Sequence, residues 1–233
     1  MSTHGDLPWL ADRLVADGVG NVERWSRQWQ HATADRRGDY AAEAYCALAL
    51  RKVGLFVEFA DADPPDLWVS IDARRFGVET RNFREKKTDV LDRAEMQLAQ
   101  SRGLLAVYGQ TELREGKAAR EQVVAAVDRK LSGRNVPIDY VMFHSDSSCV
   151  EEIDVRTARN ELADRCLSDP RLQKLRGIAL MSNWISLRER RSFWYFPMPG
   201  VDPNDSIERA LRSIAKWQDA VRGSFLRLGG EGA

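Results

Sequence analysis

The chain has 233 residues, with 35 basic and 35 acidic side chains, so its formal net charge is zero. This length fits one sizeable domain, or one domain with a short extension. Zero net charge argues against a protein that holds nucleic acid by bulk attraction, although a local basic groove stays open. Three scattered cysteines without a CxxC pair argue against a zinc site or a disulfide framework.

The start of the sequence lacks the basic stretch, apolar run and small-residue cleavage site of a signal peptide. The longest apolar runs are only a few residues, too short to cross a bilayer. We therefore expect a cytoplasmic protein with no membrane-spanning segment.

The first 35 residues predict two short helices. Asn21 is a candidate cap for the second helix, which carries Trp25 and Trp29 one turn apart. We interpret residues 1–35 as a helical extension that packs on the main body. Residues 36–228 then form the main α/β domain, and residues 229–233 form a flexible tail.

A helix is predicted from Asp39 to Val53, ended by Gly54, and a strand follows in LFVEFA. Residues 67–71 (LWVSI) and 76–83 (FGVETRNF) alternate in the manner of strands. They predict an antiparallel hairpin whose turn is centred between Asp72 and Ala73.

The second half of the chain alternates helix and strand. Helices are predicted over 88–101, 118–132, 151–167 and 204–221, and strands over 103–108, 138–144, 177–187 and 192–196. This order predicts an α/β fold with a mixed central sheet, in which an antiparallel hairpin is flanked by helices.

The hairpin brings two acids together. With its turn centred as predicted, opposed residues have index sums of 145, so Asp66 faces Glu79 with Cβ atoms about 4.5–5.5 Å apart. Two carboxylates this close repel each other unless a cation lies between them, and hard oxygen ligands suit Mg²⁺ or Mn²⁺. Arg81 lies two residues beyond Glu79, so strand alternation places it on the same face.

Pro65-Asp66, followed by Glu79-Thr80-Arg81 thirteen residues after the aspartate, resembles the motif of the PD-(D/E)XK nuclease superfamily. The preceding helix with Glu43 and the strand before the hairpin are similar to that layout, over about residues 39–109. The resemblance implies a restriction-endonuclease-like fold and a metal-dependent nuclease that hydrolyses phosphodiester bonds in DNA or RNA, with DNA ahead of RNA. Many such enzymes act in pairs, which implies a homodimer.

The resemblance also implies roles for four residues. Asp66 and Glu79 would hold Mg²⁺ or Mn²⁺, and Glu43 would add a ligand or orient water. Arg81 stands where the family has a lysine. Such a metal lowers the pKa of bound water and neutralises charge on the phosphate.

The arginine is a departure from the family pattern. An arginine clamps phosphate well but does not give up its proton as a lysine can. Lys86 and Lys87, in the connection to the next helix, are alternative sources of the amine. Gln97 resembles a glutamine that relatives place behind the hairpin.

Other interpretations stay open. Glu79 has a structural interpretation, as the partner of Arg81 or Arg74 in an ion pair. The whole chain could be a non-catalytic protein- or nucleic-acid-binding module on the same fold, with a degenerate active site and a protein partner bound by the tryptophan-rich N-terminal helices. His144 lies beside Ser145, but sequence neighbours do not build a catalytic triad, which needs separate elements to converge.

Overall fold

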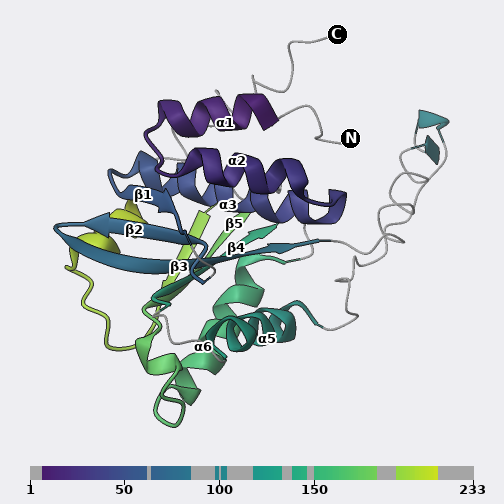
Figure 1. The fold of residues 1–233 in the computed structure, drawn as a ribbon. Coiled ribbons are helices and arrows are strands. Elements are labelled where there is room, and N and C mark those ends of the chain that lie inside the picture. The colour runs from purple at the N-terminus through teal and green to yellow at the C-terminus, as the bar shows by residue number, and fades with distance from the viewer. Residues whose placement is uncertain are drawn as a thin grey trace.

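The structure is a computed structural model with an α/β architecture. It describes residues 7–61, 64–84, 98–99, 101–103, 118–132, 138–145, 150–182 and 193–214. A six-stranded open sheet runs through the centre, and helices cover both of its faces (Figure 1).

The helices are α1 (Leu7–Ala16), α2 (Val22–His31), α3 (Ala34–Lys52), α5 (Ala119–Leu131), α6 (Glu152–Arg165) and the short 3₁₀ helix η1 (Leu172–Lys174). The strands are β1 (Phe56–Phe59), β2 (Leu67–Ile71), β3 (Arg74–Phe83), β4 (Tyr140–Ser145), β5 (Gly177–Ser182) and β6 (Phe193–Pro197). Residues 206–214 are also helical.

The strands lie in the sheet in chain order, from β1 to β6. Strands β1, β2 and β3 form an antiparallel meander, β3, β4 and β5 run parallel, and β6 is antiparallel to β5. The predicted α/β class and mixed sheet with an antiparallel hairpin are confirmed.

Strand alternation divides the hydrophobic core between the two faces of the sheet. Val78 and Met142 face the core beneath α1, α2, α3 and the helix over 206–214. Val141 and Phe143 face the core beneath α5 and α6. Because both faces are covered, every residue of β4 is buried, as expected of a central parallel strand.

The first two helices share the core of the sheet. Trp25 is fully buried, and its indole N–H donates to the carbonyl oxygen of Tyr40 at 3.0 Å. Gly20 forms an isolated parallel bridge to Glu58 on the outer side of β1. Asn21 precedes α2 as predicted, but it does not cap the helix with its side chain. Its amide instead donates to the carbonyl oxygen of Phe59 at 2.8 Å.

Helix α3 begins at Ala34, so its predicted start at Asp39 was wrong. The backbone N–H groups of Arg36 and Arg37 already donate to the carbonyl of Thr33, which begins the helix earlier. Asp39 lies inside α3 and forms an ion pair with Arg84 at 2.6 Å.

Several predicted features fall wholly or partly outside the described residues. Of the helix predicted over 88–101, residues 98, 99 and 101 are described and are helical, and Gly103 follows in a turn. Lys86, Lys87, Gln97 and residues 104–108 lie outside the described part of the chain. Within that part, no helix is both long and apolar enough to cross a membrane.

Candidate functional site

The hairpin has the predicted register. Leu67 of β2 pairs with Val78 of β3, an index sum of 145, so Asp66, directly before β2, lies opposite Glu79. The turn residues Asp72 and Ala73 have φ angles of 51° and 60°. Positive φ at both central residues is typical of the two-residue turn that matches the twist of a hairpin, which explains why the chain reverses there.

Thr80 fixes the carboxylate of Asp66. Its backbone N–H donates to Asp66 Oδ2 at 2.7 Å, and its hydroxyl donates to the same oxygen at 3.0 Å. The side chain of Asp66 therefore replaces the backbone acceptor that a longer β2 would have offered. Both bonds go to Oδ2, and in the described part of the chain Asp66 Oδ1 accepts no hydrogen bond.

Lys130 of α5 lies against both acids. Its ammonium forms an ion pair with Glu79 Oε2 and lies 3.5 Å from Asp66 Oδ2. The Glu79 side chain is 0% exposed and that of Lys130 is 21% exposed. A carboxylate buried this completely needs a cationic partner, because desolvation of an unpaired charge costs several kcal/mol.

The position of Lys130 follows from the sequence of α5. Val127, three residues earlier, is fully buried in the core beneath α5, and residues three apart share one helix face. Glu79 lies on the side of β3 that also carries Phe83, which packs in the same core. The face of α5 that packs on the sheet therefore brings the ammonium to the buried glutamate.

Glu43 of α3 completes a cluster of acids. It lies between the fully buried Ala42 and Ala44. Burial raises the pKa of Glu43 well above its ordinary value of 4.5, the carboxylate of Asp66 raises it further, and Lys130 opposes both effects. Glu43 therefore interacts electrostatically with Asp66 and Glu79.

The donor set suits a magnesium ion with few protein ligands. In the described ranges, no three acidic, histidine or cysteine side chains are arranged as a ready set of metal ligands. Magnesium keeps several waters and is often held by one or two carboxylates together with substrate phosphates. Asp66 and Glu79 supply two such carboxylates, and the ammonium of Lys130 lies against both.

Arg81 does not join this cluster. It lies on the same face of β3 as Glu79, but it is exposed and forms no ion pair with any described residue. The predicted ion pairs of Glu79 with Arg81 or Arg74 are also wrong, because Glu79 pairs with Lys130 and Arg74 pairs with Asp205. The role of Lys130 was not predicted from the sequence. Its only signal was a position on the inward face of the predicted helix over 118–132.

His144 belongs to a different network. Its ring stacks on Tyr45 with centroids 5.6 Å apart, and its Nδ1 atom lies 3.1 Å from Asn82 Oδ1. The amide of Asn82 donates to the carbonyl oxygen of Gly38 at 3.1 Å. Since this orientation makes Asn82 Oδ1 the acceptor, the proton of the pair lies on His144 Nδ1. These contacts fasten β3 and β4 to α3.

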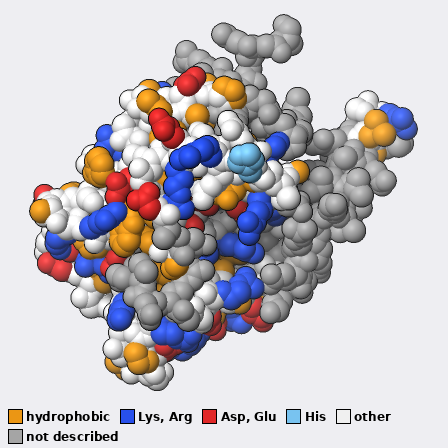
Figure 2. All heavy atoms as spheres, viewed as in Figure 1, with side chains coloured by type: hydrophobic (Ala, Val, Ile, Leu, Met, Phe, Trp, Pro, Cys, Tyr) orange, Lys and Arg blue, Asp and Glu red, His pale blue; other side chains and the backbone are white. Residues whose placement is uncertain are grey.

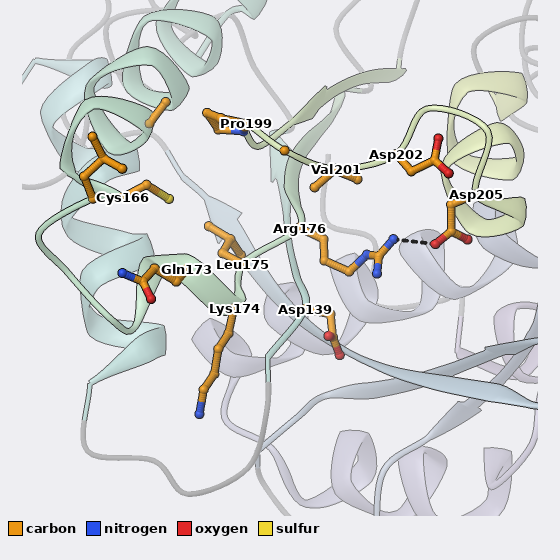
Figure 3. Close-up of a pocket in the computed structure, with 13 residues that line it drawn as sticks. Asp139, Cys166, Gln173, Lys174, Leu175, Arg176, Pro199, Val201, Asp202 and Asp205 are labelled. Atoms are coloured by element: carbon orange, nitrogen blue, oxygen red, sulfur yellow. Dashed lines mark hydrogen bonds and ion pairs between the residues drawn. The ribbon is translucent and has the colours of Figure 1, made fainter.

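An open pocket of about 860 Å³ lies near the first residues of β4 and β5 (Figure 3). Arg176 points across it toward Asp205, with which it forms an ion pair at 2.7 Å. The guanidinium also donates to the hydroxyl of Tyr140 at 2.9 Å, so two of its nitrogens are hydrogen-bonded within the protein. Neither the acid cluster nor Lys130 lines this pocket.

Comparison of the chain with family models, with curated proteins and with solved structures finds no match.

Proposed function

We propose that the protein is a metal-dependent nuclease with the restriction-endonuclease-like fold of the PD-(D/E)XK superfamily, acting on DNA ahead of RNA and as a homodimer. The observation that carries this proposal is that Asp66, Glu79 and Lys130 lie together, although they come from the residue before β2, from β3 and from α5. Two acids and one amine are the groups that the resemblance requires. Lys130 supplies the amine in place of Arg81.

The order of elements supports the same proposal. A helix with a glutamate, α3, precedes β1, and the β2–β3 hairpin bears both acids. Helix α5 then leads to β4, which is parallel to β3. The part from α3 to the hairpin is the layout that the resemblance implies, and beyond it the chain alternates helix and strand.

Each residue of the cluster has a chemical task in this proposal. Asp66 and Glu79 would hold Mg²⁺ or Mn²⁺, which when bound lowers the pKa of water and neutralises charge on the phosphate. Lys130 has three donors on a compact ammonium and can bind a phosphate oxygen or orient water. Glu43 keeps its proton to a higher pH than an ordinary glutamate, because burial raises its pKa, and so can exchange a proton with water at the site.

The test is cleavage by the purified full-length protein. Single- and double-stranded DNA and RNA are incubated with MgCl₂ or MnCl₂, and products are separated on denaturing gels. We expect cleavage that EDTA abolishes and that Asp66→Asn or Glu79→Gln lowers at least about 100-fold, because each removes charge that holds the metal. Asp72→Asn is the matched control. It makes the same change in the same hairpin, at a positive-φ position where Asn is favoured, and should leave the rate unchanged.

Two results would contradict the nuclease: no cleavage of any substrate with either metal, or equal rates in Asp66→Asn and the control.

The pairing of Lys130 with both acids favours a second candidate, a non-catalytic binding module whose acids are neutralised without a metal. That module retains its binding activity when Asp66 is changed to Asn. Trp25 and Trp29 are buried, so a protein partner on the N-terminal helices would contact Trp9, which is 40% exposed.

A further inference from the structure

The face of the β1–β2–β3 meander that carries the two acids also carries an aromatic surface. By register, Phe56, Trp68 and Arg75 lie on the same side of the sheet as Asp66 and Glu79. Phe56 is 50% exposed, Trp68 is half-buried and the Arg75 side chain is 53% exposed. This surface is therefore open to solvent beside the candidate site.

Trp68 and Arg75 form a layered pair. The guanidinium carbon of Arg75 lies over the indole ring, 4.3 Å from its centroid. An ion pair with Glu58 of β1 also holds this guanidinium. Directly opposite Trp68 on β3 stands Gly77. Indole and guanidinium groups both stack on nucleobases.

The pair lies close to the acids. Trp68 is two residues beyond Asp66, about 7 Å along the strand, which is within the span of a single nucleotide. Arg81, two residues beyond Glu79 on the same face, is an exposed cation without an ion-pair partner among the described residues. Figure 2 shows Lys and Arg side chains gathered across the middle of the face in view, between α2 and α5. Arg81, a cation on the same face of the sheet as the aromatic pair, complements the negative charge of a nucleic-acid backbone.

We propose that the Trp68–Arg75 pair is a stacking platform for one base of a single-stranded nucleic acid, whose adjacent phosphate lies at Asp66 and Glu79. A base inside a duplex is already stacked on its neighbours, so the platform selects a single strand or a splayed end. The position of the phosphate rests on the proposed function. The stacking of the base does not.

The experiment measures binding without cleavage. A fluorescein-labelled strand of twelve thymidines and a matched strand with abasic sites in place of the bases are titrated with full-length protein in EDTA, and anisotropy is recorded. The two strands have the same phosphates and differ only in their bases. A strand of twelve uridines distinguishes RNA from DNA as the source of the base.

We expect wild type to bind the thymidine strand at least about fivefold more tightly than the abasic strand. Trp68→Ala should remove this difference by weakening only the thymidine complex, and Trp68→Phe should restore most of it. Trp9→Ala, an equally large truncation at an exposed tryptophan of α1, is the control and should keep the wild-type difference.

Four outcomes overturn the platform: no binding of either strand, equal binding of both strands by wild type, an equal loss for both strands in Trp68→Ala, or an unchanged preference in that variant. Cleavage with metal but without a base preference would support the nuclease and refute the stacking platform. A base preference without cleavage would support the stacking platform and refute the nuclease.

Discussion

At the scale of single residues, the charge of Glu79 depends on Lys130. The carboxylate is fully buried, and the ammonium is the cation that the described residues place against it. Taking away one partner of such a pair leaves the other charge uncompensated in a low-dielectric environment, which costs more than the loss of a surface ion pair. Lys130 therefore has a structural task as well as the proposed catalytic one.

Lys130→Met should lower the free energy of unfolding by about 2 kcal/mol, a value reduced from that of a fully buried pair because Lys130 is partly exposed. Adding Glu79→Gln to this variant should recover much of the loss, since the buried carboxylate of Glu79 is then no longer left without its cation. Urea unfolding at pH 7 measures both effects in a double-mutant cycle. Arg120→Met on the exposed side of the same helix is the control, with a change below about 0.5 kcal/mol. Additive effects of the two substitutions would refute the coupling.

At the scale of elements, the hairpin could be predicted from the sequence because its strand pairing depends on residues that are close together in the chain. Strand alternation and one turn fix the register, and the register alone places Asp66 opposite Glu79. The contact of Lys130 was not predictable in this way. Helical spacing shows which face of α5 packs inward, but not which strand of the sheet that face covers. The predicted start of α3 was also wrong, because Asp39 looks like a cap although the helix begins at Ala34.

A second element-scale feature is the attachment of the helix over 206–214. Asp205 directly precedes this helix and accepts a hydrogen bond from the N–H of Ile207 at 3.3 Å. Arg74 of β3 and Arg176 before β5 both pair with its carboxylate. Hydrogen bonding from Arg74 and then Arg176 lowers the pKa of Asp205 below its ordinary value of 3.8.

Asp205→Asn should lower the free energy of unfolding by about 1 kcal/mol at pH 7, discounted because the Arg74 side is open to solvent. A carboxyl group whose pKa is lowered by folding stabilises the fold at pH values above its ordinary pKa. This stabilisation is lost as the pH falls through the lowered pKa. The difference between wild type and variant should therefore shrink as the pH falls below 3.8. Urea unfolding across that range measures it.

At the scale of the whole molecule, the N-terminal helices are part of the fold's core. Trp25 packs against Trp29 and Phe59 with ring centroids 5.2 and 5.5 Å apart, and all three lie in the core shared with the sheet. Deleting these helices would expose that core. A partner on this side of the protein is better tested through Trp9, which can be changed without opening the core.

Trp25→Ala should lower the free energy of unfolding by about 3–5 kcal/mol, because it leaves a large cavity and also loses the hydrogen bond to Tyr40. Trp9→Ala should cost less than about 1 kcal/mol. Equal urea midpoints for the two variants would show that α2 contributes little to the core.

Lys130 is placed by the geometry of a helix, whereas Asp66 and Glu79 are placed by the pairing of two strands. One residue deleted within α5 before Lys130 would swing the amine about 100° around the helix axis, while the carboxylates kept their places. One residue deleted in the hairpin turn would instead separate the acids and leave the amine where it is. Insertions and deletions thus provide a way to dismantle the two halves of this centre independently.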